Sequence, residues 1–158
     1  MPLDPDLLFS AGNAIVLAGW AMVILLPRRA PALMAVPKFA VPALFGLVYA
    51  GITLARFHDS GGGYGSLAEL RTLFATDELL VAGWLHYLAF DLFVGVWIAE
   101  QSDGIGLSRA IQAVILVTAF IFPPVGLVLF LATRAAMRAT TSRSGARAGV
   151  SGTRPARS

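Results

Sequence analysis

The sequence predicts an all-α membrane protein, a four-transmembrane-helix bundle with a short interfacial amphipathic helix between helices 2 and 3. Hydrophobic residues make up 57% of the 158 residues and charged residues 13%, too little polar surface to cover a water-soluble globule. Several apolar runs approach the roughly 20 residues that cross about 30 Å of hydrocarbon as a helix. Helices are required because a backbone in lipid must satisfy its own hydrogen bonds, and four segments cannot close a β-barrel.

The four predicted spans are residues 7–26, 39–55, 79–99 and 110–133. The second span is short and begins near Pro42, where a missing N–H does little harm. The fourth contains Pro123 and Pro124, which predict a mid-span kink that opens space beside the third helix. Gly46 and Ala50, four residues apart, favour close contact between the first two helices.

Residues 56–78 form the one long connection between predicted spans. Leu67, Leu70 and Phe74 recur there at three- and four-residue spacing, which predicts an amphipathic helix in the membrane interface that caps the bundle. The preceding glycine cluster, residues 61–65, has no strand before it and no Lys-Ser/Thr pair after it, unlike a phosphate-binding loop. We therefore interpret the cluster as a flexible hinge.

The domain organisation is a membrane domain over residues 1–138 and a disordered basic tail over residues 139–158. Arginines alternate with small polar residues at this end of the chain, a composition with little to bury. Anionic membrane lipids are the predicted partner of the tail, and nucleic acid is not, because no aromatic residue or motif accompanies the arginines. Four spans place both termini on one side, and counting lysines and arginines makes that side cytoplasmic.

The third span contains two polar residues, His86 and Asp91, inside an otherwise apolar segment. A charged side chain near the centre of a membrane helix costs about 2.5 to 3.5 kcal/mol on insertion scales, so it marks a buried polar site or a pathway. At about 100° per residue, His86 falls on a stripe with Phe90, Phe93 and Trp97. Asp91 falls about 140° away, on a second stripe with Trp84 and Tyr87.

A metal site is a further hypothesis for these residues. The chain has no cysteine and two histidines, His58 and His86, so neither a thiolate site nor a multi-histidine site is available. His86 and Asp91 are five positions apart, and ligands on one helix are usually three or four apart. A mixed site would therefore draw His86, Asp91, Glu78 and His58 from several segments.

Structural roles compete with these functional ones. His86 is also typical of a core histidine that bonds a neighbouring carbonyl or hydroxyl. Asp91 is also typical of a hydrogen bond between helices, with Tyr87, Tyr49, Gln112 or Asn13 as the partner. The proline-induced kink is equally compatible with packing alone.

The motif Trp84-x-His86-x4-Asp91-Leu92-Phe93, with Ser66-Leu67 and Phe74 before it and Pro124-Val125-Gly126 and Arg134 after it, resembles the abscisic-acid-deficient-four family of small membrane proteins linked to neoxanthin synthesis. The resemblance extends from Trp20 to Arg134, most of the folded chain. It implies a four-helix membrane protein that acts on carotenoids.

The resemblance implies two chemistries. Rearrangement of an epoxy-carotenoid needs no cofactor, and Asp91 and His86 would share the acid and base tasks. Oxidative cleavage of β-carotene to retinal needs iron to activate dioxygen. In both cases Asp91 and His86 are the predicted catalytic residues, and Glu78 is a possible accessory. The predicted substrate-binding residues are Trp84, Tyr87, Phe90, Phe93 and Pro124.

The function predicted from the sequence is a carotenoid-modifying enzyme in a bacterial inner membrane, either an isomerase or a cleavage dioxygenase, with a homo-oligomer as one further option. The first alternative is a transporter in which His86 and Asp91 relay protons or hold a cation. The second is a non-catalytic membrane subunit in which Asp91 locks helices together.

Overall fold

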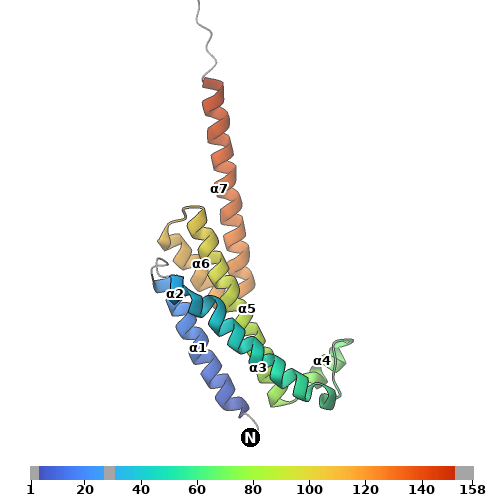
Figure 1. The fold of residues 1–158 in the computed structure, drawn as a ribbon. Helices are drawn as coiled ribbons and strands as arrows, with labels where there is room; N and C mark the ends of the chain where they lie inside the picture. Colours follow the sequence, from blue (N-terminus) through green and yellow to red (C-terminus); the bar gives the residue numbers. More distant parts are fainter. Residues whose placement is uncertain (1–3, 27–30, 152–158) are drawn as a thin grey trace, which may run out of the picture.

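The computed structural model describes residues 4–26 and 31–151. Within these residues all regular secondary structure is helical, as the sequence predicted (Figure 1). Three helices in the described part are long and apolar enough to cross a membrane: Pro5–Leu25, Ala32–Arg56 and Asp77–Gly104. The fold class is therefore confirmed as all-α, whereas a bundle of four spanning helices is not confirmed.

The first spanning helix is α1 (Pro5–Leu25), which packs along α5 (Asp77–Gly104). It begins with Asp4 as N-cap, whose carboxylate accepts a hydrogen bond from Asp6 N–H, and with Pro5 where no donor is needed. A Cβ at Gly12 would lie 2.6 Å from Leu85, and one at Gly19 would lie 2.8 Å from Leu92. These glycines let α1 approach α5 closely.

The second spanning helix is longer than predicted because it extends toward the N-terminus. It consists of α2 (Pro31–Ala35), one turn of π-helix, η1 (Val36–Ala40), and α3 (Val41–Arg56). The wider turn lets the chain pass Pro37 and Pro42 and still continue as helix, with Val41 N–H donating to Val36 O. A Cβ on Gly46 would meet nothing within 4 Å, so this glycine is not a close helix contact.

The connection after α3 contains the short helices η2 (His58–Ser60) and α4 (Leu67–Leu73). Ser66 caps α4 by accepting a hydrogen bond from Glu69 N–H at 3.2 Å. The predicted short helix between the second and third spans is therefore present, and its location in the membrane interface stays a prediction. The glycine cluster has a packing role that the hinge interpretation did not include, because a Cβ on Gly62 would collide with the backbone of Leu73.

Helix α5 is the centre of the molecule and contacts α1, α3, α6 (Arg109–Ile121) and α7 (Pro123–Ser151). Its buried side chains, among them Leu85, Leu92 and Val96, form the core with residues of the surrounding helices. Gly95 admits the indole ring of Trp20 from α1, which a side chain at this position would displace. Apart from His58 in η2 and Pro124 in α7, the residues of the predicted site thus lie on this central helix of the described fold.

The predicted fourth span is not one kinked helix but two helices that form a hairpin. Helix α6 ends at Ile121, and α7 starts at Pro123 and runs back beside it (Figure 1). A Cβ on Gly126 would overlap the backbone of Ala119, seven residues earlier, which is only attainable when the chain reverses direction. Two consecutive prolines break the hydrogen-bond ladder completely, and Gly126 lets the two helices touch.

Helix α7 continues to Ser151, well beyond the apolar part of the hairpin. The division into a membrane domain over residues 1–138 and a disordered tail over residues 139–158 stays a prediction, although α7 extends past that boundary. Residues 152–158 of the predicted tail lie outside the described residues.

Candidate functional site

A cavity of about 200 Å³, here called the aromatic cavity, lies between α3, α4 and the first half of α5. Its walls are mostly aromatic and aliphatic, with four polar groups on Tyr49, Thr53, Tyr64 and His86. The complete lining consists of Tyr49, Thr53, Phe57, Tyr64, Leu73, Phe74, Leu79, Gly83 and His86. An apolar cavity with a few convergent polar groups is the usual form of a small-molecule site.

His86 and two tyrosines form the polar part of this cavity. The rings of His86 and Tyr49 have centroids 5.0 Å apart, and the Tyr64 hydroxyl hydrogen-bonds the Tyr49 hydroxyl. Phe57 stacks on Tyr64 at 5.6 Å and fixes the position of its ring. One imidazole and two hydrogen-bonded hydroxyls, from three separate segments of the chain, therefore line the same cavity.

Two further details affect the chemistry of the aromatic cavity. The hydrogen bond to Tyr49, with a smaller contribution from desolvation, raises the pKa of Tyr64, which is otherwise 66% exposed, so its hydroxyl stays protonated at neutral pH. The Thr53 hydroxyl is buried and has no hydrogen-bond partner among the described residues. A buried hydroxyl is usually paired, so Thr53 offers a free donor and acceptor to a bound molecule.

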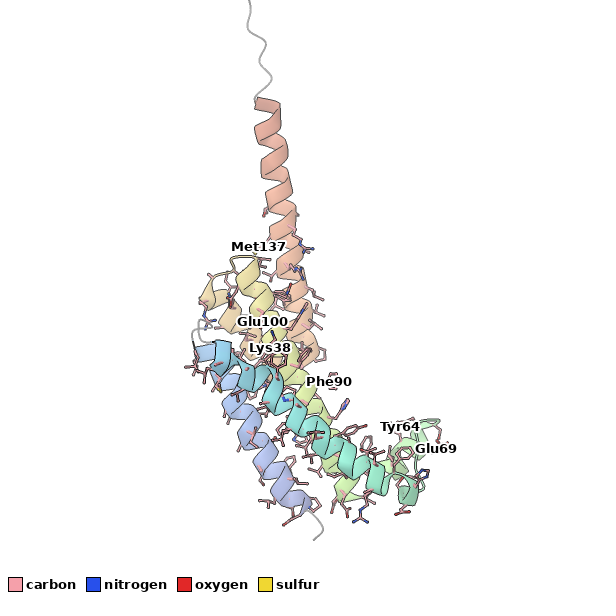
Figure 2. All side chains as sticks on the ribbon, in the orientation of Figure 1. Lys38, Tyr64, Glu69, Phe90, Glu100 and Met137 are labelled. Atoms are coloured by element: carbon pink, nitrogen blue, oxygen red, sulfur yellow. The ribbon has the colours of Figure 1, made fainter. Side chains whose placement is uncertain are left out.

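The wall contributed by α4 depends on local sequence. The Ser66 cap fixes the start of α4, and the Glu69 carboxylate accepts a second hydrogen bond from Gly65 N–H at 3.0 Å. Leu73 and Phe74, at the other end of α4, close the cavity, and Phe74 lies directly against Gly83 of α5. Figure 2 shows Tyr64 and Glu69 together at this end of the molecule.

Asp91 lies on the other stripe of α5, in a group of side chains with Tyr87, Trp84 and Asn13 that is here called the Asp91 cluster. The Tyr87 hydroxyl, one helical turn earlier, donates a hydrogen bond to the Asp91 carboxylate. The ring of Tyr87 stacks on Trp84 at 5.2 Å, and Trp84 donates from Nε1 to Asn13 Oδ1 of α1 at 3.1 Å. The cluster therefore joins α5 to α1, and Asp91 is half-buried beside it.

The structure thus keeps apart the two residues that were predicted to act together. His86 lines the aromatic cavity, whereas Asp91 lines none of the four cavities described in the molecule. Two stripes about 140° apart on one helix face different neighbours: His86 lies beside α3 and α4, whereas Trp84 of the Asp91 cluster bonds Asn13 of α1. A single pocket containing both side chains is not present among the described residues.

The predicted substrate-binding residues are similarly divided. The ring of Phe90 lies against that of His86 in a tilted arrangement, with centroids 4.7 Å apart, and Phe90 exposes 60% of its surface, so it extends the aromatic cavity toward the lipid. Trp84 and Tyr87 belong to the Asp91 cluster. Phe93 is exposed on the surface of α5, and Pro124 is exposed at the tip of the α6–α7 hairpin.

The predicted metal ligands do not converge. No three His, Cys, Asp or Glu side chains of the described residues gather closely enough to hold a metal ion. Glu78 faces Arg56 at 3.6 Å, and His58 lies in η2 beside Phe57. The donor set described here therefore does not fit an iron centre, which requires ligands from several directions.

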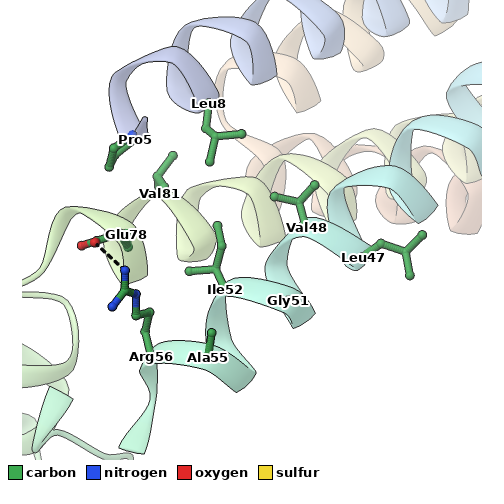
Figure 3. Close-up of a pocket in the computed structure, with 10 residues that line it drawn as sticks. All are labelled: Pro5, Leu8, Leu47, Val48, Gly51, Ile52, Ala55, Arg56, Glu78 and Val81. Atoms are coloured by element: carbon green, nitrogen blue, oxygen red, sulfur yellow. Dashed lines mark ion pairs between the residues drawn. The ribbon is translucent and has the colours of Figure 1, made fainter. Parts of the chain in front are cut away.

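A second, larger cavity of about 450 Å³, here called the lateral groove, lies between α1, α3 and α5 (Figure 3). Its walls are apolar, from Leu8 of α1 to Val48 and Ile52 of α3. The ion pair between Arg56 and Glu78 closes one end. No group suited to acid–base chemistry other than this pair lines the groove, so it fits an apolar chain better than a reacting group.

The sequence analysis did not assign Tyr49, Thr53, Phe57 or Tyr64 to the site. Tyr49 had been considered only as a partner for Asp91. One signal was available in the spacing of Tyr49, Thr53 and Phe57, which recur every four residues and share one face of α3. No pattern indicated that Tyr64, within a glycine cluster, would fold back onto that face.

Comparisons with known proteins identified one family. The family model described as ABA DEFICIENT 4-like matches residues 7–130, which include α1 through most of the α6–α7 hairpin and every residue of the aromatic cavity. Neither curated proteins nor solved structures gave a match.

Proposed function

The chain belongs to the ABA DEFICIENT 4-like family, which indicates a role in carotenoid- and neoxanthin-related processes in a membrane, and we propose that it is an enzyme that rearranges an epoxy-carotenoid in the aromatic cavity. The observation that supports this proposal is the convergence of His86, Tyr49 and Tyr64 in one apolar cavity.

The position of the aromatic cavity suits the end group of a carotenoid. Its walls include α4 and the part of α5 about 14 Å from the start of the helix at Asp77, near the membrane interface. A cavity of about 200 Å³ is smaller than sites for whole drug-sized ligands. It would therefore hold the oxygen-bearing ring while the polyene lies against Phe90 and in the bilayer.

The proposed reaction needs two proton transfers and no oxidant. A general acid protonates the epoxide oxygen as its C–O bond breaks, and a base removes one proton from the polyene carbon that becomes the centre of an allene. The product has the same formula as the substrate. His86 as base and Tyr64 as acid are the proposed catalytic residues, because the Tyr64 hydroxyl keeps its proton at neutral pH.

The role proposed for Asp91 is structural. Its carboxylate accepts from Tyr87 on a face of α5 that lies outside the aromatic cavity. The bond strengthens the contact of α5 with α1 through Trp84 and Asn13. Hydrogen bonds between membrane residues contribute about 0.6 kcal/mol on average and at most about 1.7 kcal/mol.

The test is expression in a bacterial host that accumulates violaxanthin, followed by pigment chromatography. The wild-type chain should yield an allenic isomer of unchanged mass. His86→Gln should reduce that product at least 100-fold, since general acid–base groups contribute about 10² to 10⁴ in rate. Asp91→Asn is the matched polar control on the same helix, and it should retain turnover while lowering resistance to unfolding in detergent.

Three outcomes would contradict this proposal. One is an unchanged pigment profile with correctly inserted protein. Another is full activity of His86→Gln, and the third is loss of activity in Asp91→Asn with intact stability. A parallel host that makes only β-carotene tests the cleavage alternative, because retinal in that host would require an oxidative reaction. Proton flux in liposomes without any pigment change would favour the transporter.

A further inference from the structure

The α6–α7 hairpin has legs too short to cross a bilayer. Helix α6 has 13 residues, a length of about 20 Å, and the apolar part of α7 from Pro123 to Arg134 is shorter still. The hydrocarbon core is about 30 Å thick. The hairpin therefore reaches roughly to the middle of the bilayer and returns.

Contacts with the spanning helices fix the depth of the hairpin tip. Phe120, just before the turn, packs on Trp20 of α1 with ring centroids 5.6 Å apart. Phe130, after the turn, is fully buried against Trp97 of α5 at 5.5 Å. Figure 1 shows the turn beside the middle of α5 rather than at its end.

The surface of the tip is suited to lipid. Ile121, Phe122 and Val125 expose 56%, 62% and 57% of their surfaces, and no charged residue lies between Arg109 and Arg134. An exposed apolar turn of this kind is unfavourable in water and favourable in hydrocarbon. Both ends of the hairpin instead carry arginine: Arg109 donates to the carbonyls of Ile24 and Leu26 at the end of α1.

A re-entrant hairpin changes the distribution of charge between the two ends of the bundle. The end formed by the last turns of α1 and α5 and by α7, here called the basic end, then includes ten of the twelve lysines and arginines of the chain. Six of them belong to the described residues: Lys38, Arg109, Arg134, Arg138, Arg143 and Arg147. The other four, Arg28, Arg29, Arg154 and Arg157, lie outside the described residues and are assigned to this end by their place in the sequence alone. Lys38 is placed at this end by its ion pair with Glu100 at 2.7 Å.

The opposite end, here called the acidic end, has Arg56 and Arg71 as its only basic residues in the sequence. Six of the nine acidic residues belong to it: Asp4, Asp6, Asp59, Glu69, Asp77 and Glu78. With four full spans the basic residues would divide between both sides of the membrane. With three spans and a hairpin they gather on one side.

We propose that the chain crosses the membrane three times, that α6 and α7 form a re-entrant hairpin, and that the basic end contacts the anionic lipid headgroups of the cytoplasmic leaflet. Lysine and arginine near membrane helices are retained on the cytoplasmic side, and each is attracted to anionic lipid. The N-terminus and the aromatic cavity are then on the outer side. This inference is independent of the proposed function.

Single-cysteine labelling tests the topology directly, because the native chain has no cysteine. We would introduce Ala68→Cys in α4, Gly104→Cys at the end of α5 and Ala139→Cys in α7, all at exposed positions. Intact bacterial cells and inverted vesicles are treated with a membrane-impermeant maleimide, and detergent-solubilised protein supplies the full-labelling reference. Phe122→Cys tests whether the tip of the hairpin lies within the hydrocarbon, out of reach of the maleimide.

The proposal predicts that Ala68→Cys is labelled in intact cells, that Gly104→Cys and Ala139→Cys are both labelled in inverted vesicles, and that Phe122→Cys is labelled only in detergent. Labelling of Gly104→Cys and Ala139→Cys from opposite sides would establish four spans and overturn the hairpin. Labelling of both from outside the cell would overturn the assignment of the basic end to the cytoplasmic leaflet.

Discussion

Tyr64 illustrates how one side chain depends on a partner far away in sequence. Its hydrogen bond to Tyr49, with a smaller contribution from desolvation, raises its pKa. The protonated form is therefore favoured by folding, and this contribution is fully present below the ordinary tyrosine value near pH 10. It is lost as the pH rises through the raised pKa of the folded state.

This shift leads to a prediction for activity. Turnover by the wild-type chain should persist beyond the ordinary tyrosine value near pH 10 and fall only as the pH passes the raised pKa of Tyr64, where it loses the proton that it is proposed to donate. Tyr64→Phe should be slower at every pH by a factor of at least about ten, and its rate should lack the decline at high pH. A pH–rate profile for both variants in detergent micelles provides the measurement. An identical decline in Tyr64→Phe would assign it to another group.

The positions of His86 and Asp91 show how much helical periodicity alone predicts about single residues. Helical periodicity correctly placed the two residues on separate stripes, since this depends only on 3.6 residues per turn. Periodicity does not say which helix covers each stripe. His86 has Tyr49 and Tyr64 as neighbours in the cavity. Tyr49 precedes it by 37 residues and Tyr64 by 22 residues, so only the tertiary fold brings the three together.

At the scale of elements, two helices begin with the same kind of cap and lie in different parts of the molecule. Ser66 accepts from Glu69 N–H at the start of α4, and Ser108 accepts from Ile111 N–H at the start of α6. Helix α4 forms a wall of the aromatic cavity, whereas α6 lies in the hairpin. The two serines are therefore a matched pair.

Ser66→Ala and Ser108→Ala should each destabilise the protein by about 1 kcal/mol, the usual effect of removing an N-cap. Turnover should fall several-fold in Ser66→Ala alone, because the fraying of α4 loosens Leu73 and Phe74 at the cavity. Unfolding in detergent and pigment conversion, measured on both variants, check the two effects separately. Equal losses of turnover would show that activity follows global stability rather than α4.

Most element boundaries could be predicted, and the exceptions share a physical cause. The spans built on long apolar runs, α1 and α5, begin and end within a few residues of the predicted positions. The run at residues 110–133 has the length and hydropathy of a span, and the prolines indicated only that it is interrupted. Whether such an interruption produces a kink or a reversal depends on the contact between Gly126 and Ala119, which no local pattern contains.

The number of crossings determines the arrangement of the whole molecule. Four crossings placed both termini together in the sequence analysis and left Arg28, Arg29 and Lys38 on the less basic side. Three crossings and a hairpin remove that conflict, since all three then lie on the same side as Arg109 and the C-terminal arginines. Composition established the membrane environment. The number of crossings depended on residues 110–133, because hydropathy does not distinguish a spanning helix from a hairpin in this segment.

Charge reversal at the acidic end gives a prediction at this scale. Replacing Asp4, Asp6 and Asp59 by lysine raises the number of basic residues near this end from two to five. A substantial fraction of the molecules should then insert in the opposite orientation, because the first helix usually dominates topology. The fraction is measured by labelling Ala139→Cys in intact cells. The same three positions changed to asparagine form the control, which should keep a single orientation.

The length of α7 has a practical consequence for imaging. From Arg134 to Ser151 the helix projects beyond the apolar part of the molecule, a distance of about 27 Å. A folded partner fused in continuous helical register at its end would stand clear of the detergent belt. A 16.7 kDa chain lies almost wholly inside such a belt and offers electron microscopy few features for particle alignment. The projecting helix gives this protein a natural attachment point for a fiducial domain.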